Sequence, residues 1–254
     1  MTGFTELTLQ TLLLISGIVL FAGLVHGTLG LGFPMVATPL LALQTDVLSA
    51  ILIVLLPTLT VNLITIFSSG SGWNSLRRYW PLAIYGGVGS VLGTKLLLLT
   101  DPAPYKILLA VAILFYLNVN RIGIRMRWVP ERPALAFAIF GLSGGFLAGT
   151  VNVMVPALIV FALEAGLSPT VSVQVFNLCF LVGKLPQALI LGRTGVLTGE
   201  VLLATLPIAG IAAAALCAGM LIRKKIAADT YRGWMRKVLF AVSLVLIAQY
   251  AGVI

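Results

Sequence analysis

The sequence predicts an all-α integral membrane protein with about ten transmembrane or half-membrane helices in two inverted repeats of five segments. Hydrophobic residues make up 60% of the 254 residues, and charged residues only 9%. The mean hydropathy is +1.12. Long apolar runs such as 48–67 approach the roughly 20 residues that a bilayer-spanning helix needs, and the basic residues gather between such runs. Since soluble globular chains are about 25% charged, the composition excludes a large soluble catalytic domain.

The apolar segments can be drawn in order along the chain. They cover 9–25, 32–43, 47–68, 79–99, 104–120, 134–148, 150–163, 170–191, 200–222 and 234–252. The first follows a stretch without Lys or Arg, so we expect a retained transmembrane segment rather than a signal peptide. The second and seventh segments, at about 12–14 residues, cover roughly 20 Å and cannot cross a hydrocarbon core of about 30 Å. We therefore expect both to be half-membrane helices.

Basic residues in three loops predict the orientation. These residues are Arg77 and Arg78; Arg121, Arg125, Arg127 and Arg132; and Arg223, Lys224, Lys225, Arg232, Arg236 and Lys237. The positive-inside rule places such loops in the cytoplasm. With ten segments both termini then lie outside it, in a membrane of the bacterial inner (cytoplasmic) type. The net charge of +9 fits this pattern better than nucleic-acid binding.

The two halves of the chain resemble each other. "HGTLGLGFPMVATPLL" (26–41) can be laid on "SGGFLAGTVNVMVPAL" (143–158), which pairs Gly27 with Gly144, Gly32 with Gly149 and Pro39 with Pro156. We expect a first repeat over 1–120, a basic cytoplasmic linker over 121–133 and a second repeat over 134–254. Because five is an odd number, the second repeat enters the membrane from the opposite side, as in many secondary transporters.

A glycine-rich patch precedes each short segment, at 27–34 and at 144–152. Irregular backbone at membrane depth persists only inside protein or beside a water-filled cavity. Two helix N-termini that meet there, with free N–H groups and positive dipole ends, favour an anion. Gly30, Gly32 and Gly149 would let the backbone approach it closely. Tight packing of helices through small residues is the alternative explanation.

Polar side chains add further candidates for the same site. Thr150 and Asn152 stand at the expected start of the seventh segment, where they can cap the helix or donate to a ligand. Lys184 lies near the centre of the eighth segment, and no segment has Asp or Glu in its middle, so a substrate anion would pair with it. Snorkelling, or carbonyls freed by Pro186, is the alternative.

The remaining candidates have two interpretations each. His26 can donate to the anion, carry a coupled proton or form part of the packed interior. Asn62, Asn177 and Gln187 can line a path for the anion or join neighbouring helices.

The two aligned stretches resemble the duplicated glycine-rich signature of the sulfite exporter TauE/SafE family, and the resemblance covers nearly the whole chain. Phe33 and Pro34 in the first stretch, and Thr150, Val151 and Asn152 in the second, stand where that family usually has glycine. The resemblance implies transport of a small sulfur-containing anion, such as sulfite, thiosulfate, sulfoacetate or a related sulfonate. The departures leave open which of these anions it is.

A secondary transporter of such an anion is therefore the expected function, with a passive anion channel of the same architecture as the alternative. A membrane-embedded enzyme would need clustered carboxylates, a nucleophile–base pair or a metal set, and the chain has one His. A subunit without a site of its own would not need the glycine patches or Lys184. No GxxxxGK[ST] motif is present, so direct ATP use is not expected. The expected partners are the anion and membrane lipid, with a homodimer left open. No nucleic acid, cofactor or metal is expected.

Overall fold

The computed structural model describes residues 9–68, 73–101, 103–119, 126–223 and 228–252. Within these ranges the chain is helical and contains no strand. The helices are α1 (Leu9–Leu29), α2 (Phe33–Ala42), α3 (Val47–Ser68), α4 (Trp73–Leu99), α5 (Ala103–Asn118), α6 (Trp128–Glu131), α7 (Pro133–Val151), α8 (Val155–Glu164), α9 (Pro169–Arg193), α10 (Gly199–Ile222) and α11 (Ala228–Tyr250). The chain termini and residues 121–125 of the predicted basic linker lie outside the described residues.

A helix covers each of the apolar segments drawn from the sequence. Six helices, α1, α3, α4, α7, α9 and α10, are long and apolar enough to cross a membrane, which makes the chain a multi-pass membrane protein. α2 and α8 have 10 residues each, or about 15 Å, so the prediction of two short helices is confirmed. The one-turn helix α6, within the basic linker, was not predicted because four residues show no periodicity.

The predicted start of the second short helix is wrong. α7 continues through Val151, and α8 begins only at Val155, five residues after the expected 150. Gly149 and Thr150 therefore belong to the last turn of α7. Glycine does not break the helix here because α4 packs directly against it: a Cβ added at Gly149 would lie 2.8 Å from Thr94 N.

The corrected bounds place the two chain breaks at residues 30–32 and 152–154. Each break contains a left-handed residue, Gly30 with φ 79° or Asn152 with φ 61°. Each short helix then has Pro as its second residue, where the missing N–H costs nothing. When the two halves are aligned on these breaks, Gly27 is paired with Gly149, and Pro34 with Pro156. The sequence alignment instead pairs Gly27 with Gly144, Gly32 with Gly149 and Pro39 with Pro156.

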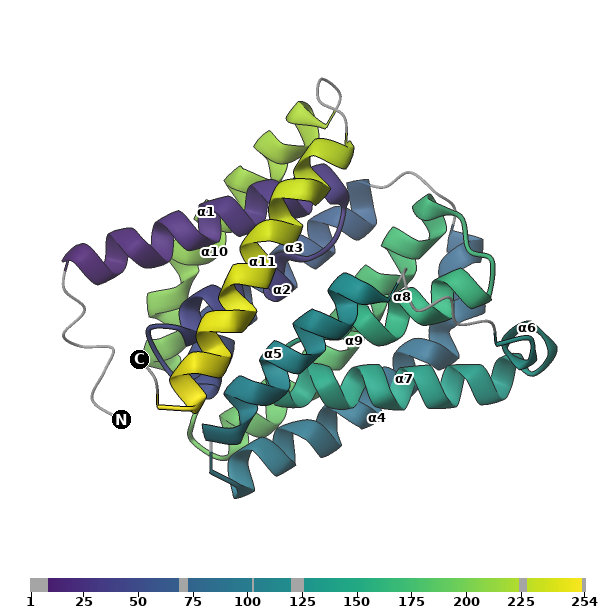
Figure 1. The fold of residues 1–254 in the computed structure, drawn as a ribbon, viewed down its shortest axis with the longest axis horizontal. Helices are drawn as coiled ribbons and strands as arrows, with labels where there is room; N and C mark the ends of the chain where they lie inside the picture. Colours follow the sequence, from purple (N-terminus) through teal and green to yellow (C-terminus); the bar gives the residue numbers. More distant parts are fainter. Residues whose placement is uncertain (1–8, 69–72, 102, 120–125, 224–227, 253–254) are drawn as a thin grey trace.

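Helix contacts come in matching pairs. α1 packs on α10 as α7 packs on α4, and α3 contacts α10 as α9 contacts α4. α3 also contacts α9, and α5 contacts α11. Figure 1 shows α5 and α11 crossing the middle of the view, between the α1–α10 pair and the α4–α7 pair.

Glycines bring the backbones together at both crossings. A Cβ at Gly27 of α1 would lie 2.8 Å from the Cα of Gly219 in α10, and one at Gly149 of α7 would lie 3.0 Å from the Cα of Gly93 in α4. Small residues of this kind allow close helix packing in membranes. For Gly27 and Gly149, packing is therefore the structural role.

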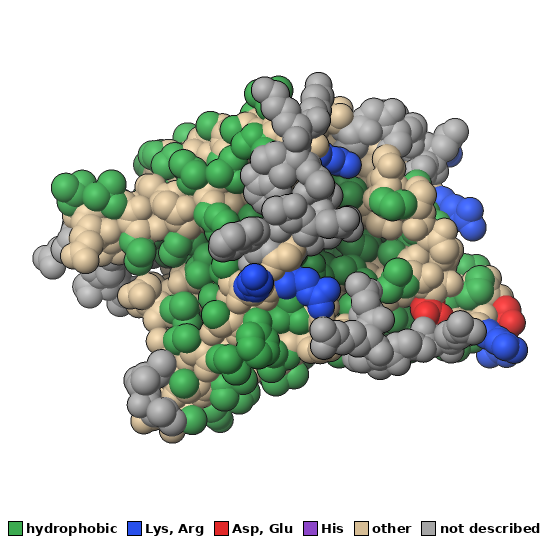
Figure 2. Space-filling view, turned by 45° about the horizontal axis from the view of Figure 1, so that its top comes forward, with side chains coloured by type: hydrophobic (Ala, Val, Ile, Leu, Met, Phe, Trp, Pro, Cys, Tyr) green, Lys and Arg blue, Asp and Glu red, His purple; other side chains and the backbone are tan. Residues whose placement is uncertain are grey.

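Large hydrophobic side chains remain exposed on the outer surface, among them Leu13, Leu99 and Leu203. In Figure 2 hydrophobic side chains cover broad parts of the face shown, while Lys and Arg side chains lie in small separate groups. An apolar exterior of this kind suits contact with lipid rather than water.

Candidate anion-binding site

All of the candidate residues chosen from the sequence are buried. They are His26, Gly30, Gly32, Asn62, Gly149, Thr150, Asn152, Asn177, Lys184 and Gln187. The described hydrogen bonds place most of them in two groups along α9. One group surrounds Lys184, and the other surrounds the break between α1 and α2. Asn177 and Lys184 are seven residues apart on α9, so roughly 10 Å separates the two groups.

The first group centres on Lys184, which is 1% exposed. Its ammonium donates to Gln187 Oε1 one helical turn further along α9, and Gln187 Nε2 donates to Gly149 O at 3.2 Å. Among the described residues no carboxylate forms an ion pair with this lysine. An ammonium can donate three hydrogen bonds, and the described contacts account for one. Lys184 is therefore a buried lysine whose described partners are all neutral.

Sequence reasoning missed two buried hydroxyl groups at the crossing of α4 with α7. Ser90 and Thr94 of α4 lie at the crossing with α7, next to Gly149, and a Cβ at Gly183 would lie 3.8 Å from Ser90 Cβ. Their hydroxyl oxygens are buried and have no hydrogen-bond partner among the described residues. Buried polar groups of this kind normally have a partner, so both hydroxyls are candidates for binding a ligand. Their spacing of four residues is the signal that could have identified them.

The second group is organised by His26. Its Nδ1 accepts from the Phe33 N–H of α2 at 3.2 Å, and its Nε2 lies 3.1 Å from Thr65 Oγ1. Thr65 Oγ1 itself donates to Val61 O at 2.7 Å, so Nε2 must be the donor to Thr65. The imidazole is thus neutral, with its proton on Nε2 and both nitrogens engaged. His26 is part of the packed interior, and its first role is to hold the start of α2.

Asn177 ties α9 to the same break. Its Nδ2 donates to Gly30 O at 2.8 Å and to Val173 O at 2.7 Å. Gly30 and Gly32 have φ angles of 79° and 103°, a region that disfavours any side chain. These two glycines thus form the turn between α1 and α2, and Asn177 connects α9 to that turn.

The second break contradicts the predicted caps. Asn152 ends α7 in a left-handed conformation and donates through Nδ2 to Thr38 Oγ1 of α2 at 2.7 Å. Thr150 donates to Phe146 O within α7 at 2.9 Å. Neither caps α8, whose N-cap residue is Met154. The prediction failed because it placed the start of the helix too early.

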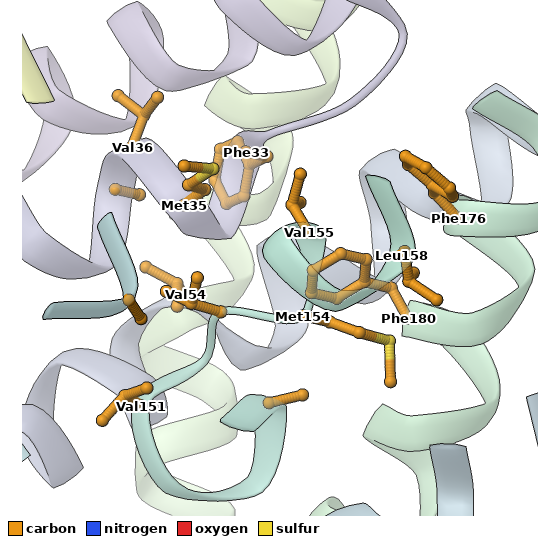
Figure 3. Packing of buried hydrophobic residues seen from close by; sticks show 14 of the residues in the cluster. Phe33, Met35, Val36, Val54, Val151, Met154, Val155, Leu158, Phe176 and Phe180 are labelled. Carbon is orange, nitrogen blue, oxygen red and sulfur yellow. The ribbon is translucent and has the colours of Figure 1, made fainter. Parts of the chain in front are cut away.

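The break before α8 nevertheless contacts α2 directly, through the hydrogen bond from Asn152 to Thr38. In Figure 3 Phe33 of α2 lies near Val155 of α8, and both belong to one buried hydrophobic cluster. Asn152 Oδ1 has no hydrogen-bond partner among the described residues. The side chains between the two helix starts are therefore mainly apolar, with a few polar groups at their edge.

Asn62 of α3 belongs to neither group by its described hydrogen bonds. Its amide nitrogen and the hydroxyl of Thr58, one turn away, are buried without a partner among the described residues. Counted from the first residues of α3 and α9, Asn62 occupies the place that Lys184 occupies in the second half. α3 and α9 are in contact, and each carries a buried nitrogen donor at the same distance from its first residue.

The buried polar atoms without a hydrogen-bond partner among the described residues include the amide nitrogen of Asn62, the hydroxyls of Thr58, Ser90 and Thr94, and two acceptors, the amide oxygens of Asn152 and Asn177. Lys184 adds Nζ, which makes one described hydrogen bond. Among the described residues no group of three His, Cys, Asp or Glu could hold a metal ion. Charged and neutral donors without an opposing carboxylate suit an oxyanion.

The comparison with protein families agrees with this chemistry. The sequence model of the sulfite exporter TauE/SafE family matches residues 15–250 of the chain. No curated protein and no solved structure matches it. The match spans both breaks, both short helices and Lys184, and the chain therefore belongs to the sulfite exporter TauE/SafE family.

Proposed function

We propose that the chain is a secondary transporter that moves a small sulfur-containing anion, namely sulfite, sulfoacetate or a related organosulfonate, across the cytoplasmic membrane. Membership of a family of sulfur-anion transporters supports the substrate class. The observation that carries the proposal is Lys184, a fully buried cation that no described carboxylate neutralises. Buried charges are costly unless they are paired, and the anion would provide the pair.

The depth of Lys184 supports a site near the middle of the membrane. α9 runs from Pro169 to Arg193, and the lysine lies three residues beyond its centre, about 4.5 Å along the axis. The first turns of α2 and α8 begin inside the bundle, where dipole ends would add to the attraction for an anion. Ser90, Thr94 and Asn62 would supply neutral hydrogen bonds.

The matching helix contacts support two inverted repeats. Exchanging α1–α5 for α7–α11 turns the α1–α10 crossing into the α7–α4 crossing, and the α3–α10 contact into the α9–α4 contact. The two breaks, each with a left-handed residue before an X-Pro helix start, correspond in the same way. Inverted repeats allow alternating access by rocking one part against the other around a central site.

Counterflow in proteoliposomes tests the transport mechanism. Vesicles loaded with unlabelled sulfite or sulfoacetate should take up radiolabelled anion faster than empty vesicles, because a carrier returns faster when loaded. Vesicles containing Lys184→Met protein should lose this stimulation, and Lys95→Met, which replaces an exposed lysine of α4, should retain it. Uptake without stimulation by anion on the far side would identify a channel, and no uptake of any tested sulfur anion would refute the proposal.

A further inference from the structure

A cavity of about 200 Å³ lies between the two halves of the chain. Its walls come from the end of α1 and the following break (Leu29 and Leu31), the end of α5 (Tyr116 and Leu117), Ile159 of α8, and the start of α11, including Arg236. This volume is far above the roughly 10–15 Å³ needed for one water molecule. The cavity therefore has room for a small hydrated anion.

Arg236 is the charged residue in this wall. Its Nη2 donates to Leu117 O at 2.6 Å, which satisfies a carbonyl in the last turn of α5. Among the described residues no carboxylate forms an ion pair with it. A guanidinium has five N–H donors in a planar fork, so several remain after the bond to Leu117. The arginine is thus fixed at the cavity wall with donors to spare.

The position of the cavity links it to the interior. Leu29 and Leu31 flank Gly30, whose carbonyl accepts from Asn177 of α9. Two turns further along α9 is Lys184. Arg236 belongs to the third basic cluster of the sequence. An anion in the cavity would lie between these basic residues and the break between α1 and α2.

We propose that this cavity is a second anion site, in which Arg236 binds the transported oxyanion through its guanidinium fork before the anion reaches Lys184. The proposal rests on the transport function above. A guanidinium matches the paired oxygens of a sulfite or sulfonate group, and a charged cavity concentrates counter-ions from the surrounding water. At saturation, one anion would then occupy the cavity at Arg236 and a second anion the site at Lys184.

Equilibrium binding of radiolabelled sulfite and sulfoacetate to purified protein tests the second site. Wild type should bind two anions per chain, Arg236→Gln should bind one, and Arg236→Lys should bind two with lower affinity at one site. Arg223→Gln, an exposed arginine at the end of α10, is the matched control and should bind two. The site at Arg236, whose side chain is exposed, should lose affinity steeply with ionic strength, because salt screens exposed charges.

The outcomes separate the two proposals. Two retained sites in Arg236→Gln, even with a lower melting temperature, would show that Arg236 only caps α5 and would overturn the second site. One wild-type site that disappears in Lys184→Met would also overturn it, while the transport proposal would stand. Wild-type protein that binds and transports neither anion would overturn both.

Discussion

His26 connects the start of α2 to α3 through the two nitrogens of its ring. Nδ1 accepts from Phe33 N–H, and Nε2 donates to Thr65. An imidazole engaged in this way has no free nitrogen for a coupled proton. These two hydrogen bonds could not be predicted from the sequence alone, because Thr65 and Phe33 approach His26 only after α1, α2 and α3 have packed.

We expect His26→Ala to destabilise the protein by about 1–3 kcal/mol, the cost of leaving a buried hydrogen-bonding group unsatisfied. His26→Asn should recover part of this loss, because its Oδ1 can accept from Phe33 N–H. Thermal unfolding in detergent measures both. If His26 carries a coupled proton instead, His26→Asn will shift or abolish the pH dependence of transport; our account expects the pH profile to stay unchanged.

Two glycine-lined crossings join the halves at the level of the helices. Gly145 of α7 lies directly against Gly86 of α4, and Gly149 lies against Gly93. An added methyl group at either α7 position would meet backbone atoms, which cannot rotate away. Close approach of backbones is thus built into the α4–α7 pair and, through Gly27 and Gly219, into the α1–α10 pair.

Gly149→Ala and Gly145→Ala should therefore lower stability by about 1–3 kcal/mol or more, the usual cost of overpacking. Gly210→Ala is the matched control, since nothing lies within 4 Å of a Cβ at this position in the middle of α10. It should unfold at or above the wild-type temperature. Melting curves of the purified variants give the comparison, and wild-type stability in Gly145→Ala would contradict the described crossing.

The helices could largely be predicted from the sequence, because hydropathy depends on local composition. Lys184 was visible for the same reason, as a charge in an apolar run. The boundary between α7 and α8 was not, since glycine breaks or continues a helix according to what packs against it. Ser90 and Thr94 were missed because the crossing of α4 with α7, which nothing in the local sequence encodes, brings them next to Gly149.

The molecule as a whole should have both termini outside the cytoplasm. The motivation is the three basic loops and the odd number of segments in each proposed repeat. A single cysteine at Thr2 or Val253, both outside the described residues, should react with an impermeant thiol reagent added to intact cells. A cysteine at Met126 should react only after the membrane is opened. The background for these variants is Cys179→Ala and Cys217→Ala.

The opposite result has a clear meaning. A label at residue 253 that is protected in intact cells, together with an accessible one at residue 2, would require an odd number of spans. That outcome would be incompatible with two inverted halves of five segments. The matching contacts of α1–α10 with α7–α4 would then need another explanation.

A buried lysine that pairs with the transported anion is the central claim, and thermal unfolding of purified protein with increasing sulfite or sulfoacetate tests it most directly. At 100 times the Kd, a ligand that binds only the folded state adds about 2.7 kcal/mol of stability. Lys184→Met should weaken binding by roughly 10- to 100-fold, since a hydrogen bond to a charged group contributes about 1.5–3 kcal/mol. Without ligand, the variant can be as stable as wild type, because it no longer buries a charge. Lys184→Arg should keep part of the shift, because a guanidinium also binds oxyanions. A Lys184→Met protein with the full wild-type shift would contradict the account.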